Sequence, residues 1–237
     1  MIPEPITSKL LDELTGFAPE VFFKPFTKAR YLRECKKALQ VDAVNAYMCM
    51  GIVHGHSDDF LLMKENFQAA LSLDPNDMLI LRNYVTSLGN FGRYSDVVDI
   101  ISKNNELLNS EFCFHALLRA LSGTLNLTVL DDIAPSYTER ARKTLSILNV
   151  QESDVRQLML TFNSLMEKQN VRFGVQFNSS WHLDDDMAYL YYDFFGTPND
   201  AMKIMKEFDQ LVVENNMGDV ASKVIIILLP IKSSVAA

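Results

Sequence analysis

The chain has 237 residues and a formal net charge of −8, and 48% of its residues are hydrophobic, which is enough apolar material for a folded core. Because it has no run of Lys or Arg, we expect no binding to nucleic acid through neutralisation of phosphates. The longest apolar run, Val224 to Pro230, is too short to span a bilayer, and Met1 to Pro5 lacks the features of a secretory signal, so we expect a cytoplasmic protein that does not associate with membranes.

The first 25 residues predict a short N-terminal segment that precedes the main helices. Thr7 or Ser8 can cap a short helix, and Gly16 is expected to end it. Pro19 and Pro25 interrupt the chain after this helix. The same stretch holds a dense apolar group without helical or strand periodicity: Phe17, Val21, Phe22, Phe23 and Phe26. Two interpretations are open, because this group can cover the first helices as a cap or form an exposed aromatic hook for a partner.

A helix is predicted over residues 27–42, where Ala29, Leu32, Cys35 and Leu39 follow the helical spacing of three and four residues. The stretch from Val44 to Asn105 then repeats itself. Apolar residues recur at a displacement of 34 positions: Tyr47 and Leu81, Phe60 and Tyr94, Met63 and Val97, Phe67 and Ile101. A fixed period of this length is typical of stacked helical hairpins.

Small residues and helix breakers occur where nested helices need them. Gly51 has no side chain, which lets a partner helix approach closely. Asp74-Pro75 ends the second helix of the first copy, and Asn76 or Asp77 can cap the next helix. With Tyr47, His54, Phe67 and Ala70, this pattern resembles the tetratricopeptide repeat (TPR), closely over 44–77 and more loosely over 78–109. Asn104 and Asn109 depart from the repeat, since Ala and Pro are usual there.

The TPR resemblance implies a concave face, made by the first helix of each hairpin, that binds a protein or peptide. On this chain the expected partner-binding residues are Asn45, Met48, Ile52, Arg82, Asn83 and Thr86. Some TPR proteins hold a C-terminal carboxylate there, but Met48 and Ile52 occupy positions of that clamp, so we do not expect one here. The alternative is that the N-terminal segment covers these residues.

Three further helices are predicted, over 111–121, 137–148 and 155–168, with Phe112, His115, Leu118 and Leu121 forming the apolar face of the first. After them the pattern changes. Strands are expected over 171–177, 187–195 and 223–229, and Thr197-Pro198-Asn199-Asp200 is a strong helix start between the last two. A crossover of this kind places the last two strands parallel.

The predicted fold is therefore mainly α: an N-terminal cap over 1–25, a TPR-like helical array over 26–168, and a small β-β-α-β layer over 169–237. The strand over 187–195 is apolar on both sides and is expected to be covered on both. One helix is a small cover for such strands, so homo-oligomerisation through this sheet is a further possibility.

The clearest candidate for chemistry is an expected loop over 178–186, which holds Trp181, His182 and the acids Asp184 to Asp186. It is either a solvated turn or partner contact, or a metal or acid–base site. His54 and His56 lie two residues apart, which prevents them from binding one ion on a helix, and both His54 and His115 are expected to serve in packing. Cys35, Cys49 and Cys113 form no CxxC pair and are expected to be buried free thiols.

No catalytic, phosphate-binding or dinucleotide fingerprint is present, so we expect no catalytic residues, no metal and no cofactor. The leading hypothesis is a noncatalytic interaction module, such as an adaptor, a chaperone, an immunity or antitoxin-type inhibitor, or a regulatory subunit. Two alternatives stay open. One is an enzyme using His182 with Asp184 or Asp186, and the other is a sensor whose C-terminal layer binds a small ligand.

Overall fold

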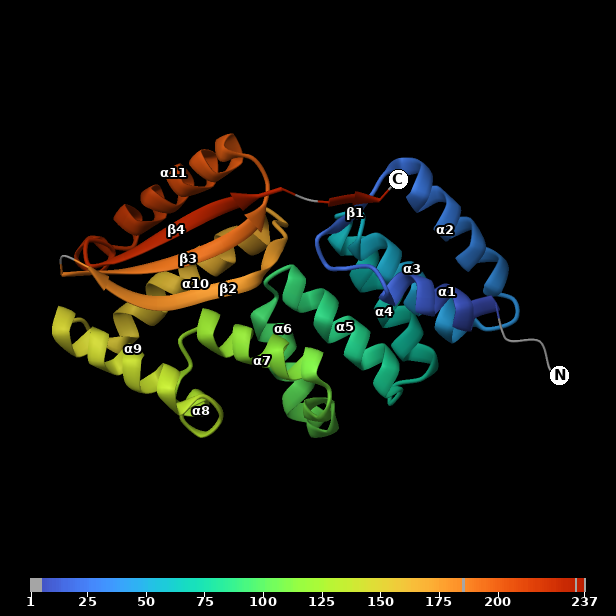
Figure 1. Ribbon diagram of the computed structural model, residues 1–237, viewed down its shortest axis with the longest axis horizontal. Coiled ribbons are helices and arrows are strands. Elements are labelled where there is room, and N and C mark those ends of the chain that lie inside the picture. The colour runs from blue at the N-terminus through green and yellow to red at the C-terminus, as the bar shows by residue number, and fades with distance from the viewer. Residues whose placement is uncertain (1–5, 185, 233, 237) are drawn as a thin grey trace.

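The computed structural model describes residues 6–184, 186–232 and 234–236, and it is mainly helical with a small sheet near the C-terminal end (Figure 1). The helices are α1 (Ile6–Thr15), α2 (Pro25–Ala38), α3 (Ala43–Gly55), α4 (Phe60–Leu73), α5 (Met78–Asn90), α6 (Tyr94–Lys103), the 3₁₀ helix η1 (Asn105–Asn109), α7 (Glu111–Gly123), α8 (Leu127–Ile133), α9 (Pro135–Leu148), α10 (Glu152–Lys168), α11 (Pro198–Glu214) and α12 (Gly218–Ala221). The strands are β1 (Val21–Phe23), β2 (Phe173–Asp184), β3 (Met187–Phe195), β4 (Val224–Ile231) and β5 (Ser234–Ala236).

Two successive helix pairs, α3 with α4 and α5 with α6, occupy the repeated stretch. Helix α5 begins 35 residues after α3, and α6 begins 34 residues after α4. The first pair is packed closely at Gly51, because a Cβ atom there would lie 2.8 Å from the ring of Phe67. Phe67 in turn stacks on Tyr84 of α5, with the ring centroids 5.1 Å apart. The absence of a side chain at Gly51 therefore sets how closely α3 and α4 approach.

Local capping fixes where these helices begin. The Asp42 carboxylate accepts a hydrogen bond from the Asn45 backbone N–H at the start of α3. At the start of α5, Asp77 accepts from the Leu79 and Ile80 N–H groups, as predicted for this position. The helix expected over 27–42 begins earlier, with Pro25 at its first turn, and ends at Ala38.

Helix α7 buries only part of the predicted face. The predicted Leu121 is buried, but the other buried residues are small: Cys113, Ala116, Ala120 and Gly123. Phe112 is 71% exposed, and His115 is exposed and paired with Glu111, so the expectation that both lie in the core is wrong. Small residues meet where α5 and α7 pack together: a Cβ on Gly89 of α5 would be in van der Waals contact with the Ala116 side chain, at 3.5 Å.

The C-terminal sheet has the order β2-β3-β4, with β2 antiparallel to β3. The parallel pairing of β3 with β4 is as predicted. Thr197 and Asp200 form a reciprocal capping box at the start of α11, between these two strands. The core on one face of the sheet includes Phe162 of α10, whose ring lies 4.8 Å from Tyr192 of β3 and 5.2 Å from Phe208 of α11.

Two expectations about this sheet are wrong. The predicted loop over 178–186 is mostly strand, because β2 continues to Asp184 and pairs with β3 up to Met187. The strand β3 is covered fully on one face only, since buried and half-buried residues alternate along it. The half-buried positions of β3 and β4 include Tyr189, Tyr191, Ile225 and Ile227.

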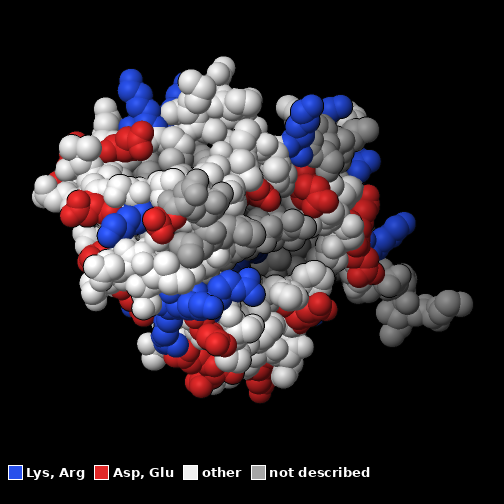
Figure 2. Space-filling view, turned by 60° about the vertical axis from the view of Figure 1, so that its left-hand side comes forward, with Lys and Arg blue, Asp and Glu red and all other residues white. Residues whose placement is uncertain are grey.

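A segment near the N-terminus pairs with one near the C-terminus. Strands β1 and β5 pair in parallel, with Val21 opposite Ser234 and Phe23 opposite Ala236 (Figure 1). The buried residues form one hydrophobic cluster in the N-terminal half and one in the C-terminal half, and Val98 and Leu117 contact both. Figure 2 shows acidic and basic side chains interspersed over one face of the molecule, and most of the coloured surface belongs to uncharged residues.

Candidate functional site

A groove of about 470 Å³ lies between α5 and the N-terminal segment. The α5 side is lined by Leu79, Arg82, Asn83, Thr86, Ser87 and Asn90. The opposite side is lined by Leu11, Asp12, Leu14 and Thr15 of α1 together with Phe17 and Pro19. Ile52 of α3, His56 directly after α3 and the exposed Phe112 of α7 complete the lining. The groove thus combines apolar side chains with hydroxyl, amide and oppositely charged groups.

Four of the six predicted partner-binding residues line this groove: Ile52, Arg82, Asn83 and Thr86. The Asn83 side-chain amide donates to the Leu79 carbonyl at 2.9 Å, and the Thr86 hydroxyl donates to the Arg82 carbonyl at 2.9 Å. These bonds to the helix's own backbone hold the two side chains in place. Arg82 is exposed and forms no ion pair within the described part of the chain, so its guanidinium is available to a partner.

The other two predicted residues lie away from the groove. Met48 is fully buried, and its sulfur lies 3.6 Å from the Asn83 side-chain nitrogen. Asn45 donates its side-chain amide to Asp42 at 2.8 Å, beside the start of α3. Met48 therefore packs against Asn83 from the protein interior, and Asn45 takes part in the N-cap of α3.

His56 presents a neutral ring to the groove. Its Nδ1–H donates to the Val21 carbonyl at 2.8 Å, and its ring stacks on Phe23 with a centroid separation of 4.9 Å. Burial lowers the pKa of His56, and the positive charge of Arg172 acts in the same direction. The ring is therefore uncharged at neutral pH and serves as a hydrogen-bond donor to the N-terminal segment.

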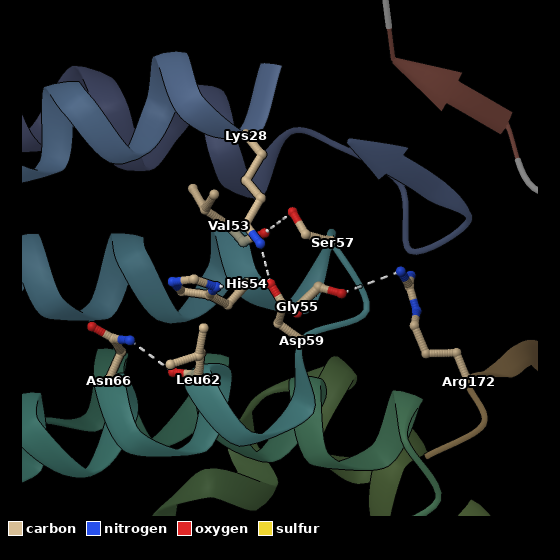
Figure 3. Close-up of polar contacts among 9 residues, drawn as sticks. All are labelled: Lys28, Val53, His54, Gly55, Ser57, Asp59, Leu62, Asn66 and Arg172. Carbon is tan, nitrogen blue, oxygen red and sulfur yellow. Dashed lines mark hydrogen bonds and ion pairs between the residues drawn. The ribbon is translucent and has the colours of Figure 1, made fainter. Parts of the chain in front are cut away.

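Behind His56, Arg172 joins the start of the sheet to the groove wall. Its guanidinium donates to the Gly55 carbonyl at 3.2 Å (Figure 3). It also donates to the carbonyl of Pro19, a lining residue. The guanidinium also lies 4.1 Å from the centre of the Phe22 ring. Burial lowers the pKa of Arg172, and the nearby charge of Asp58 opposes that shift.

A second polar chain connects α2 with the α3–α4 turn. Lys28 pairs with Asp59, whose carboxylate lies 3.3 Å from Nδ1 of the buried His54 (Figure 3). Burial lowers the pKa of His54, which the bond to Asp59 only partly offsets. His54 does not line the groove, and its partners are those of a packed side chain, in keeping with the packing role predicted for it.

The strands on either side of the acidic residues pair with each other, with Asp184 opposite Met187. Trp181 is buried, His182 lies opposite Tyr189 in the strand ladder, and Asp186 adopts a left-handed backbone with φ of 62°. The side chains of His182 and Asp184, and all of residue 185, lie outside the described residues. The enzymatic alternative that depends on them stays a prediction.

No three His, Cys, Asp or Glu side chains gather as a metal site within residues 6–184, 186–232 and 234–236. The three cysteines are free and buried, as predicted. Burial raises the pKa of Cys35 and of Cys49 to about 12, which keeps both as unreactive thiols.

Sequence reasoning missed several lining residues, three of them within the repeat and one, Phe112, beyond it. His56, Ser87 and Asn90 line the groove, and Phe112 stands at its edge. Ser87 and Asn90 follow Asn83 by four and seven positions, so helical spacing from Asn83 could have found them.

Comparisons with protein-family models, curated proteins and solved structures find no match to this chain. In the described part of the chain, no helix is both long and apolar enough to cross a membrane.

Proposed function

We propose that this protein is a noncatalytic interaction module in which a TPR-like array binds a polypeptide segment in the groove along α5. The observation that carries the proposal is the groove itself, with apolar and polar side chains from three parts of the chain. This mixed lining suits an extended or helical segment of a protein.

The energetics of such a groove favour one anchoring side chain. Ile52, Leu79 and Phe112 offer apolar contact, and burying one partner Leu or Phe among them contributes about 1.5–3 kcal/mol. Arg82 and Asp12 lie on opposite sides and can pair with charges of either sign. An apolar anchor surrounded by polar groups is the usual arrangement of energetically important interface residues.

The TPR-like character rests on the paired helices and on the contact of Gly51 with Phe67. The N-terminal segment forms one wall of the groove and leaves Arg82 exposed. An adaptor, a chaperone and an immunity or antitoxin-type inhibitor all fit a binding groove of this kind.

A groove-filling substitution tests the proposal. Thr86→Trp places an indole in the groove, and Ser95→Trp, at an exposed position on α6, is the matched control. Proteins captured by the tagged wild type from its native host are identified, and the affinity of the purified partner is measured by calorimetry. We expect Thr86→Trp to weaken binding at least about tenfold, or about 1.4 kcal/mol, with the control unchanged. Equal binding by all three proteins would refute the groove as the site.

A second cavity favours the sensor alternative. It measures about 520 Å³ and lies where α10 ends, β2 begins and α11 begins. Its lining includes Arg172, Phe195, Lys203 and Glu207. A small ligand in this cavity would raise the melting temperature of the wild type, which a thermal-shift screen measures.

We also propose that the half-buried face of the C-terminal sheet supports self-association. Tyr189 and Tyr191 stack with ring centroids 6.5 Å apart, and Ile225 and Ile227 lie beside them on β4. These apolar side chains are only partly covered within the chain, and a second copy would bury them.

A further inference from the structure

Helix α2 carries a concentration of positive charge that contrasts with the rest of the molecule. It lies at the outer end of the helical array, at the right-hand margin of Figure 1. Its sequence contains five cationic residues and a single acid, whereas the whole chain has a formal net charge of −8. The cations are Lys28, Arg30, Arg33, Lys36 and Lys37, and the acid is Glu34.

Internal ion pairs neutralise only part of this charge. Lys28 pairs with Asp59, and Arg30 lies 3.7 Å from Glu13. Arg33 and Lys37 share the single carboxylate of Glu34, at 3.5 and 3.1 Å. Lys36 is exposed and has no ion pair within the described residues. The C-terminal half of α2 therefore presents three cations to solvent with one acid among them.

Apolar side chains lie on the same outer face. Phe26 is 81% exposed, and Ala29 follows it by three residues and is also exposed. A shallow groove of about 560 Å³ is lined by Ala29, Leu32, Arg33, Lys36 and Lys37. The opposite face of the helix is already used in the core, where Tyr31 and Cys35 are buried. The outer face is thus apolar at its beginning and basic at its end, with the i, i+3, i+7 spacing of a helical contact surface.

We propose that this outer face of α2 binds an acidic amphipathic segment of a partner protein. The apolar side of that segment would contact Phe26, Ala29 and Leu32, and its carboxylates would pair with Arg33, Lys36 and Lys37. An acidic partner is proposed because of charge complementarity, since α2 is positive on an otherwise acidic chain. The surface shares no lining residue with the groove along α5, so the two sites are independent.

A membrane surface and a nucleic acid fit the outer face of α2 less well than an acidic polypeptide. A helix that lies on a membrane buries a continuous apolar face, but on α2 Tyr31 is buried in the core, Leu32 is half-buried, and Phe26 is the one strongly exposed large apolar residue. A chain of net charge −8 is also repelled by anionic lipids and by nucleic acid. An acidic polypeptide meets the short basic face without bringing the remainder of the molecule close to a large anionic surface.

The test uses a fluorescein-labelled peptide in which Leu and Glu repeat with helical spacing, and a second peptide with Gln in place of Glu. Binding to the full-length protein is measured by fluorescence anisotropy. We expect the triple reversal Arg33→Glu, Lys36→Glu, Lys37→Glu to weaken binding of the Glu peptide at least about tenfold. Raising NaCl from about 50 to about 300 mM should weaken wild-type binding several-fold. Hydrogen exchange should show protection by the peptide within α2.

A matched triple reversal on other helices is the control: Arg140→Glu, Lys143→Glu and Arg156→Glu, at exposed positions of α9 and α10. It should bind the Glu peptide within about twofold of wild type, after correction for the changed net charge by the salt series. Phe26→Ser should weaken binding several-fold without changing the salt dependence. Circular dichroism checks that every variant is folded.

Several results would overturn the proposal. The first is equal affinity of the wild type for the Glu and Gln peptides. The second is an equal loss of affinity for the Glu peptide in the two triple variants. The third is unchanged affinity in Phe26→Ser. Flotation of the wild-type protein with vesicles of phosphatidylserine and phosphatidylcholine, lost in the α2 triple variant, would assign the face to a membrane. Wild-type dimers that become monomers in that variant would assign it to a second copy.

Discussion

Replacing Gly51 with alanine tests how closely α3 and α4 are packed. The new Cβ would lie 2.8 and 2.9 Å from two atoms of the Phe67 ring, closer than side-chain carbons approach in folded proteins. The ring cannot swing aside freely, because Phe67 is fully buried and stacks on Tyr84. Overpacking of this kind costs about 1–3 kcal/mol. Alanine recovers about 0.5–1 kcal/mol of that through its better helix propensity.

Gly55→Ala is the matched control in the same helix. Its Cβ would meet Met63 at 3.6 Å, which is ordinary contact, so the variant should equal or exceed wild-type stability. The free energy of unfolding of Gly51→Ala, measured by urea unfolding followed by circular dichroism, should therefore be about 1–3 kcal/mol lower than that of Gly55→Ala. In a Phe67→Leu background the cost of Gly51→Ala should largely disappear, giving a coupling energy of about 1–3 kcal/mol. A Gly51→Ala protein as stable as Gly55→Ala would refute the close packing.

Three further predictions concern the groove wall and the sheet. Arg172→Met removes donors to the Gly55 and Pro19 carbonyls and should lower the free energy of unfolding by about 2–3 kcal/mol in urea titrations, and a loss under about 0.5 kcal/mol would contradict this. The folded pKa of His56 lies below its ordinary value of 6.5, so the unfolded chain binds the proton first. The contribution of neutral His56 to the free energy of unfolding is fully present above pH 6.5 and is lost as the pH falls from there through the folded pKa. The free energy of unfolding of a His56→Gln variant should therefore vary less with pH over this range. Tyr191→Lys should reduce self-association in sedimentation velocity, and a wild type that is monomeric at every concentration would exclude the sheet interface.

Helix positions and strand types were predictable where local chemistry specifies them strongly. The strand over Met187–Phe195 is confirmed at both ends, and the helix start predicted at Thr197 is confirmed. Asp77 caps α5 as predicted. Each of these signals depends on neighbouring residues only, so tertiary contacts had little opportunity to override it.

The buried faces of α2 and α7 were not predictable by the same means. A stripe of large apolar residues was expected to face the core. On α7 the predicted Leu121 is buried, but Phe112 is exposed and Cys113, Ala116 and Ala120 are buried instead. Close helix contact selects small side chains, and a single sequence does not reveal which face will meet a neighbour. Strand β1 was missed because three residues are too few to show a period.

The groove illustrates why the candidate site could be predicted only in part. The TPR resemblance implied that Arg82, Asn83 and Thr86 share one exposed face of one helix, and these three residues line the groove together. The opposite wall depends on where residues 11–19 lie, which is fixed by bonds over long sequence distances. Arg172 donates to the Pro19 carbonyl across 153 positions, and His56 donates to the Val21 carbonyl across 35. Since both donors also contact the α3 end of the groove, a substitution at either should alter the width of the groove without touching α5.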